Sequence, residues 1–125
     1  MCRLEHYSLA DILDICQKSR VFFETNPIGF GFHISNFPKG WCGDASRYIK
    51  RRLHEQLGID FTYHSGSMHT PESTNTYNHA WLEYDNLIID ITADQFNHLG
   101  FSNNPIIITT DRTFHDLFLH DRKSE

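Results

Sequence analysis

The chain has 125 residues, of which 39% are apolar, including the 14% that are aromatic, and 22% are charged, with a formal net charge of −5. This length and composition predict a single globular domain over residues 1–125 with a core of its own. The acidic balance speaks against a nucleic-acid partner, since a nucleic-acid-binding face needs concentrated positive charge. No segment approaches the roughly 20 apolar residues of a membrane span, and the N-terminus lacks the order of a secretory signal, so we expect a cytoplasmic protein with no membrane partner.

The cysteines and histidines lack the spacings of structural sites. Cys2, Cys16 and Cys42 make an odd count, and the nine histidines form no HxH or HxxxH pattern. An odd cysteine count is poor material for a disulfide framework, and metal sites place their ligands at characteristic close spacings. We therefore expect reduced thiols, no metal and no cofactor.

The first predicted element is a helix over residues 9–23. Ser8 is a typical N-cap residue, with an acidic residue three positions later. The helix is expected to end before Asn26 and Pro27. Cys16 falls on the apolar stripe and is interpreted as a small buried hydrophobe. The apolar positions at helical spacing are Leu9, Ile12, Leu13, Cys16 and Val21.

A second helix is predicted from residue 44, after a Gly- and Pro-rich loop over residues 28–40. Its apolar residues recur every fourth position, charged residues take the other face, and Gly58 supplies the stop. Cys42 lies at its N-terminal end. The apolar face consists of Ala45, Ile49, Leu53 and Leu57.

The second half of the chain changes to strand-like patterns. Short runs rich in β-branched and aromatic residues predict strands, and Asp85 and Asn86 predict a tight hairpin turn. The polar residues 68–78 predict a loop, and residues 114–119 fit either a short helix or a closing strand. We expect an α+β fold with two helices on a small antiparallel sheet of about four strands. The predicted strands cover residues 61–64, 80–84, 87–92 and 106–109.

Cys42 is the candidate nucleophile. The thiolate is the reactive form of cysteine, and a helix N-terminus stabilises it through unpaired N–H groups and the helix dipole. The small neighbours Gly43 and Ala45 leave room for a substrate backbone, and the Cys42 amide can face a developing oxyanion. A cysteine before a helix is a weak signal by itself, because most such thiols are inert.

His79 and Asp90 lie on opposite arms of the predicted hairpin. Residues equidistant from a turn face one another, and simple counting pairs His79 with a residue near 92, so an offset or bulge is needed for Asp90. The acid then holds one imidazole nitrogen while the other faces the thiol. Asp94 is the alternative orienting acid, with Asp90 then capping a turn. The alternative bases are His33, His64 and His98.

Three sequence blocks resemble the transglutaminase-like superfamily. Gly40–Ala45 (GWCGDA), His79–Glu83 (HAWLE) and Ile88–Thr92 (IIDIT) resemble its Cys, His-Ala-Trp-x-Glu and Asp-x-Thr blocks. The resemblance covers about residues 38–96. It implies a papain-like core, in which a helix carrying Cys packs on an antiparallel sheet carrying His and Asp. It also implies a catalytic set of Cys42, His79 and Asp90.

This resemblance implies a thioester mechanism on a peptide bond or a side-chain carboxamide, with a peptide or protein as substrate. The short span between His79 and Asp90, and the lack of extra domains or a calcium site, favour a peptidase, amidase or deamidase over a crosslinking enzyme. One alternative is an inactive papain-like module that binds a peptide in the same groove. The other is a metal-binding regulatory protein that uses Cys42, His79 and further histidines.

Further candidates surround the three-residue set. Trp81 and Glu83 share the face of His79 by strand alternation, so Trp81 either shields the imidazole, lines an acyl pocket or packs in the core. Glu83 is interpreted as a structural partner. Asn36 precedes Cys42 at the spacing of the oxyanion-hole glutamine of papain-like peptidases, although a polar turn explains it as well. Gln95 is a second oxyanion candidate.

Overall fold

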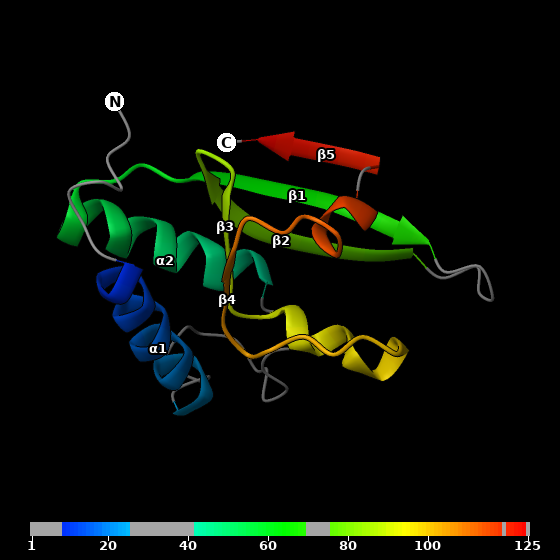
Figure 1. Ribbon diagram of the computed structural model, residues 1–125, viewed down its shortest axis with the longest axis horizontal. Helices are drawn as coiled ribbons and strands as arrows, with labels where there is room; N and C mark the ends of the chain where they lie inside the picture. Colours follow the sequence, from blue (N-terminus) through cyan, green and yellow to red (C-terminus); the bar gives the residue numbers. More distant parts are fainter. Residues whose placement is uncertain (1–8, 26–41, 70–75, 119, 125) are drawn as a thin grey trace.

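Two α-helices and a five-stranded antiparallel sheet make up the described part of the computed structural model (Figure 1). The structure describes residues 9–25, 42–69, 76–118 and 120–124, except for the side chains of residues 69, 76 and 120–124. The elements in chain order are α1 (Leu9–Thr25), α2 (Cys42–Leu57), β1 (Thr62–His69), β2 (Thr76–Tyr84), β3 (Leu87–Asp90), the 3-10 helix η3 (Ala93–Leu99), β4 (Ile107–Thr109), the 3-10 helix η4 (His115–Leu117) and β5 (His120–Ser124).

The sheet has the strand order β4-β3-β2-β1-β5, with every neighbouring pair antiparallel. The expected α+β class is therefore confirmed, with one strand more than expected because the C-terminal segment adds β5 along β1 (Figure 1). The pattern over residues 114–119 fits either a short helix or a closing strand. The structure places η4 within this segment, directly ahead of β5.

The predicted loop over residues 68–78 is wrong at both ends, because β1 continues to His69 and β2 begins at Thr76. The polar residues there belong to a regular ladder in which Ser67 pairs with Asn78 and Met68 with Tyr77. The Ser67 hydroxyl donates a 2.7 Å hydrogen bond to the Asn78 side-chain oxygen. Cross-strand partners thus satisfy polar groups that, in the sequence, indicated a loop.

The hairpin between β2 and β3 turns as predicted at Asp85 and Asn86, whose φ angles of 54° and 72° fit a tight two-residue turn. The register is regular and pairs Leu82 with Ile89. Continued by one residue, it sets Asp90 opposite Trp81, so that His79 is the diagonal neighbour of Asp90 on the same face. The expected offset or bulge is therefore not needed, because this diagonal pair already meets, with His79 Nε2 at 2.6 Å from Asp90 Oδ2.

The helix α2 agrees with its prediction. Its buried face includes Ala45, Ile49 and Leu53, each no more than 1% exposed. Gly58, with a φ of 69°, donates its N–H to the His54 carbonyl and ends the helix.

The helix α1 forms over the expected residues, but its buried face was predicted only in part. Ile12 and Cys16 are buried, whereas Leu9, Leu13 and Val21 are exposed. The buried stripe instead takes in the polar residues Ser19 and Arg20, which find hydrogen-bond partners in the interior. None of the helices in the described ranges is long and apolar enough to span a membrane.

The sheet separates two apolar clusters. Under α1 and α2, aliphatic side chains such as Ile12, Leu53 and Leu82 form the larger one. On the other face, η3 and the segment around η4 cover a smaller and more aromatic cluster. Its buried members are Met68, Trp81, Ile88, Phe96 and Phe118.

Gly66 allows the second cluster to close against β1. It pairs directly with His79 across β1 and β2, and a Cβ atom at this position would collide with the backbone carbonyl of Phe118. Glycine is therefore required where the chain after η4 crosses β1. This crossing brings Phe118 against the His79 ring, with ring centroids 5.4 Å apart.

Candidate active site

Asp90 is the last residue of β3 and is held by its own backbone. Its Oδ1 atom accepts a 2.9 Å hydrogen bond from the Thr92 N–H, with the Thr92 hydroxyl 3.4 Å away. An aspartate that caps the amide two residues ahead in this way turns the chain out of the strand. The Asp-x-Thr block thus has a local physical role: it ends β3 and leaves Oδ2 for other donors.

Two histidines occupy that second oxygen. The Nε2 atom of His79 lies 2.6 Å from Asp90 Oδ2, and the Nε2 atom of His115 lies 2.7 Å from the same oxygen. The three side chains are at most 1% exposed. Short hydrogen bonds to a carboxylate in so dry an environment are strong and fix the orientation of both rings.

The electrostatics of the cluster favour a charged His79 beside a charged Asp90. Burial alone lowers the pKa of His79, but the Asp90 carboxylate outweighs it and, with a contribution from Cys42, raises that pKa to about 9. Burial alone raises the pKa of Asp90, but the His79 charge and the two imidazole hydrogen bonds hold it well below its usual range. At neutral pH the pair is an imidazolium and a carboxylate.

Cys42 is the first residue of α2 and is half-buried at the edge of the larger apolar cluster. Its side chain lies close enough to His79 to raise the pKa of the imidazole. Since Nε2 of His79 is bound to Asp90, Nδ1 is the ring nitrogen left for the thiol. This Nδ1 has no hydrogen-bond partner among the described residues. The structure thus joins the imidazole and the acid and brings the thiol near, without an aligned hydrogen bond between thiol and imidazole.

Cys16 has a contrasting environment. It is fully buried in α1, and burial, with the nearby Asp90 charge, raises the pKa of its thiol to about 12. A thiol held protonated inside the core is unreactive, in agreement with its interpretation as a small hydrophobe. Cys2 lies outside the described residues.

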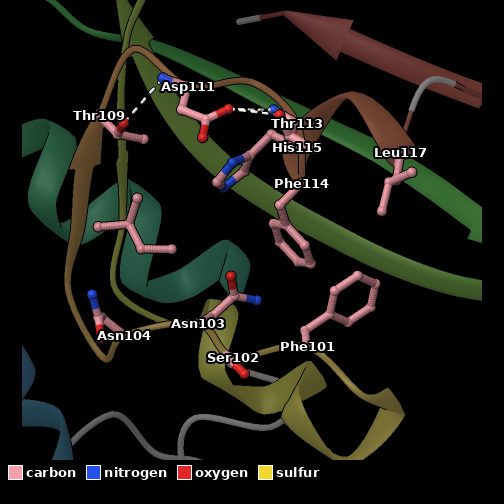
Figure 2. A pocket seen from close by; sticks show the side chains of 11 residues that line it. Phe101, Ser102, Asn103, Asn104, Thr109, Asp111, Thr113, Phe114, His115 and Leu117 are labelled. Carbon is pink, nitrogen blue, oxygen red and sulfur yellow. Dashed lines mark hydrogen bonds between the residues drawn. The ribbon is translucent and has the colours of Figure 1, made fainter.

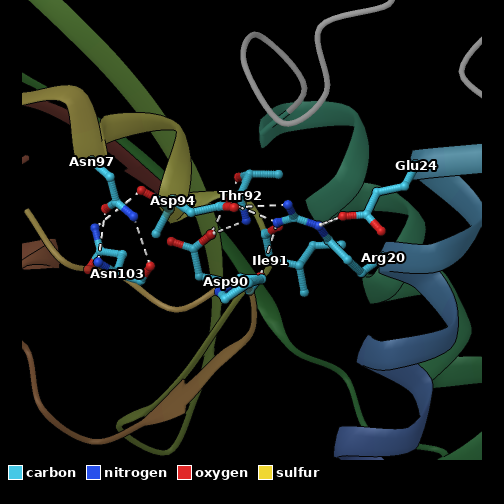
Figure 3. A network of polar contacts seen from close by, with 10 residues as sticks. Arg20, Glu24, Asp90, Ile91, Thr92, Asp94, Asn97 and Asn103 are labelled. Atoms are coloured by element: carbon cyan, nitrogen blue, oxygen red, sulfur yellow. Dashed lines mark hydrogen bonds and ion pairs between the residues drawn. The ribbon is translucent and has the colours of Figure 1, made fainter.

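Asp94, the alternative orienting acid, is bound by a different group (Figure 3). Both of its oxygens accept hydrogen bonds of 2.9 Å from the guanidinium of Arg20, which also donates to the Ile91 carbonyl at 2.6 Å. Of the two candidates, Asp90 is therefore the one in contact with His79. Asp94 links η3 to α1.

Aromatic rings enclose His79. Phe96 and Trp81 lie with their ring centroids 5.0 and 5.7 Å from the imidazole. Trp81 is fully buried and donates its indole N–H to Glu83 at 2.7 Å, and Glu83 in turn binds the Arg112 guanidinium. Trp81 thus combines core packing with shielding of the imidazole, and Glu83 is the structural partner that was expected.

The remaining candidates are less engaged. Gln95 lies half-buried on η3 with its amide nitrogen enclosed. His64 lies 3.8 Å from Glu83 and stacks beside Trp81, and His98 lies 3.0 Å from the Gln95 carbonyl. His33 and Asn36 fall outside the described residues, so these two predictions are untested.

A cavity of about 400 Å³ lies on the His115 side of Asp90, between β4, η4 and the chain after η3 (Figure 2). Phe101, Phe114 and Leu117 give it an apolar end, while Asn103 and Asp111 are among its polar lining residues. The His115 ring forms part of its wall, as Figure 2 shows. The carboxylate is therefore flanked by His79 on one side and, through His115, by this cavity on the other.

His79, Asp90 and His115 also form the one group of three potential metal-ligand atoms within 4.8 Å of one another in the described ranges. Two imidazoles and a carboxylate are a known ligand set for iron or zinc. Here the nitrogen–oxygen separations of 2.6 and 2.7 Å are those of direct hydrogen bonds. Within the described part of the chain, the second ring nitrogen of each histidine lacks the hydrogen-bond partner that metal-bound imidazoles usually have. The geometry therefore fits a hydrogen-bonded cluster, and the lack of a metal stays a prediction.

His115 is the member of this cluster that the sequence did not predict. It lies 25 residues beyond Asp90, within an apolar stretch that includes Phe114 and Phe118. A histidine among apolar residues, with Asp111 four positions before it and Asp116 beside it, gives no sign in the sequence that its partner is Asp90. The partner itself becomes visible only when the chain folds.

Comparison of the chain with protein-family models, with curated proteins and with solved structures found no match. The resemblance to the transglutaminase-like superfamily therefore rests on the three sequence blocks.

Proposed function

We propose that this chain is a cysteine-dependent acyl-transfer enzyme that acts on a peptide bond or a side-chain carboxamide. The observation that carries the proposal is the buried hydrogen bond between His79 and Asp90, which leaves Nδ1 of the imidazole for Cys42 at the start of α2. A nucleophile, a base and an acid that orients the base are the minimal set for this chemistry.

The reaction proceeds in two halves. In the first half the Cys42 proton resides on His79 Nδ1, and the thiolate attacks the substrate carbonyl, forming a C–S bond and an oxyanion that faces the amides at the start of α2. The C–N bond then breaks, and His79 returns its proton to the leaving amine or ammonia. Water, deprotonated by His79, attacks the thioester, and cleavage of the C–S bond gives the acid and the free thiol.

Asp90 supports both halves electrostatically. Its charge, buried next to His79, stabilises the imidazolium that forms whenever the thiol or water gives up a proton. The rings of Phe96 and Trp81 keep water from screening this pair. A pKa of about 9 for His79 keeps the imidazole protonated at neutral pH.

Hydrolysis fits better than crosslinking. The Cys-bearing helix on an antiparallel sheet that carries His79 and Asp90 supports a papain-like core. The separation of 11 residues between His79 and Asp90 is short for the crosslinking enzymes of the superfamily that the blocks resemble. We therefore assign a peptidase, amidase or deamidase activity on a peptide or protein substrate.

The test is the reactivity of the three thiols in the native protein. Iodoacetamide labelling, followed by peptide mass mapping, gives the rate at each cysteine from pH 4 to pH 10. We expect Cys42 to react at least about tenfold faster than Cys2, with an onset well below the roughly pH 8.5 of a free thiol. Cys16 is the internal control, because it is labelled only on unfolding. His79→Ala is expected to move the Cys42 onset upward. Equal rates at Cys42 and Cys2 would contradict the proposal.

A second candidate is an inactive papain-like module that binds a peptide without cleaving it. The observation in its favour is that the His79 side chain is fully buried and its Nδ1 is not hydrogen-bonded to the thiol. The same labelling experiment separates the two functions. A Cys42 thiol that titrates like a free cysteine, with no change in His79→Ala, identifies the inactive module.

A further inference from the structure

His115 stands outside the three-residue set, yet it binds the Asp90 oxygen that His79 uses. The two Nε2 atoms lie 2.7 and 2.6 Å from Oδ2. With the Thr92 amide on Oδ1, Asp90 accepts three short hydrogen bonds from three separate directions. A carboxylate held in this way has little freedom to rotate.

The surroundings fix which ring nitrogen of His115 donates. Its Nδ1 atom is buried and has no hydrogen-bond partner among the described residues. Its Nε2 atom lies 2.7 Å from Oδ2 of the Asp90 carboxylate, and a carboxylate oxygen can only accept. His115 therefore donates to Asp90 from Nε2.

The ring is fixed before any substrate binds. It packs at 5.0 Å, between ring centroids, against both Trp81 and Phe114. The short η4 turn is closed by the hydrogen bond from the Phe118 N–H to the His115 carbonyl at 3.1 Å. The Nε2 donor of His115 is thus preorganised and binds the Asp90 carboxylate without rearrangement.

We propose that His115 is a positioning residue for the acyl transfer, donating from Nε2 to fix the Asp90 carboxylate so that His79 stays aligned with Cys42. The inference rests on the proposed function and assigns to that reaction a fourth residue that never touches the substrate. If His79 were the only donor, Oδ2 would accept a single hydrogen bond. The carboxylate could then rotate about the hydrogen bond that Oδ1 accepts from Thr92.

The same contact sets a pH limit for the site. The titratable groups that interact with Asp90 are His79 from β2, His115 from η4 and Cys16 from α1, with Asp111 acting on His115 from the far side. Removing one imidazole donor raises the pKa of Asp90. The ion pair with His79 then breaks at a higher pH during acidification, and reactivity of Cys42 is lost there too.

Two substitutions at one position test the role. His115→Gln places an amide N–H near the original Nε2 atom, whereas His115→Leu fills the space without a donor. Iodoacetamide labelling of Cys42 is measured from pH 4 to pH 9, with the melting temperature of each variant. We expect the glutamine variant to stay within about threefold of the parent rate and the leucine variant to lose about 10–100-fold, as misaligned catalytic groups do. In the His115→Leu variant, the loss of Cys42 labelling on acidification is expected to begin at a higher pH than in the parent.

Two results would overturn the inference. If the folded leucine variant labels Cys42 at the parent rate, Asp90 does not need His115. If the rate of Cys42 labelling falls by the same factor in both variants, His115 merely supports the fold. Failure of the proposed function has a different signature, since Cys42 of the parent protein would then react no faster than Cys2, whatever stands at position 115.

A measurement on the unaltered protein covers the case in which the leucine variant does not fold. Long-range ¹H–¹⁵N NMR assigns the tautomer of each histidine ring. We expect His115 to carry its proton on Nε2 at pH 7, with a downfield proton shared with Asp90. A proton on Nδ1 would remove the donor and with it the inference.

Discussion

Asp90 and Asp94 lie close together in the sequence and yet belong to two different kinds of site. Two fully buried imidazoles bind Asp90. By contrast, both oxygens of Asp94 accept hydrogen bonds from the guanidinium of Arg20 (Figure 3). The Asp90 side chain is 1% exposed and the Asp94 side chain 17%. The Asp-x-Thr block favours Asp90 as the orienting acid, but the local sequence does not show which partner binds each carboxylate.

The difference lies in what the partners can do. An imidazole gains and loses a proton near neutral pH, so the carboxylate that binds it can influence proton transfer. A guanidinium stays protonated, so the Arg20 pair can only stabilise the fold. Arg20 also donates to the carbonyls of Ile91 and Pro105, and thereby ties α1 to the segments on both sides of η3. On the proposed function, Asp90 takes part in the chemistry and Asp94 supports the fold.

The largest effect should separate the two acids by reactivity. Asp90→Asn removes the charge that stabilises the His79 imidazolium, and we expect it to lower the rate of Cys42 labelling per folded molecule by about 10²–10⁴-fold. Asp94→Asn is the matched control, expected to stay within about threefold of the parent because it does not touch His79. The fraction folded is taken from far-ultraviolet circular dichroism.

The reverse pattern, with Asp94→Asn unreactive and Asp90→Asn reactive, would mean that the two acids exchange roles in solution. If both variants keep the parent rate, the site works as a pair of Cys42 and His79 without an orienting acid.

A second effect concerns stability. Arg20→Met leaves the Asp94 charge largely enclosed without its partner and frees two backbone carbonyls, so we expect the free energy of unfolding to fall by about 3–5 kcal/mol. Lys18→Met on the same helix is the control. It removes an exposed ion pair with Asp14, 3.0 Å long, and should cost about 0–1 kcal/mol.

Urea unfolding measures both variants, and Cys42 labelling below the transition shows whether the site survives. A labelling rate that falls with Arg20→Met in the folded state would show that the architectural network also aligns the site.

The third effect is the dependence of stability on pH. In the folded protein the pKa of His79 is raised to about 9. Its contribution to the free energy of unfolding is therefore complete below the unfolded pKa of about 6.5 and is lost as the pH rises through 9. The pKa of Asp90 is lowered in the folded protein, so its contribution to the free energy of unfolding is present above about pH 4. This contribution is lost only in strong acid. We therefore expect maximal stability between about pH 4 and 6.5, and a loss of up to about 3 kcal/mol towards pH 9.

Urea unfolding of the parent and of His79→Ala at each pH isolates this contribution. Cys16, whose thiol also binds its proton more tightly in the folded state, is present in both proteins and cancels. Parallel curves for the two proteins between pH 6.5 and 9 would mean that His79 is not charged in the folded state.

Local patterns in the sequence were sufficient for the elements that frame the site. Four-residue apolar spacing predicted α2 with Cys42 at its start, and two turn-forming residues at 85 and 86 predicted the hairpin. The hairpin in turn made His79 and Asp90 neighbours. These features depend on residues within one or two turns of the chain, so the sequence carries them directly.

Tertiary structure decided the rest. The apolar stripe of α1 does not show that Arg20 points inward, because its partner Asp94 comes from the other end of the chain. The polar stretch before His79 becomes strand because β1 supplies its hydrogen-bond partners. His115 reaches Asp90 after η4 folds back over the sheet. The sequence by itself determined the candidates for the chemistry, apart from His115. Burial and distant hydrogen-bond partners determined the charge and orientation of these side chains, because those depend on which segments pack together.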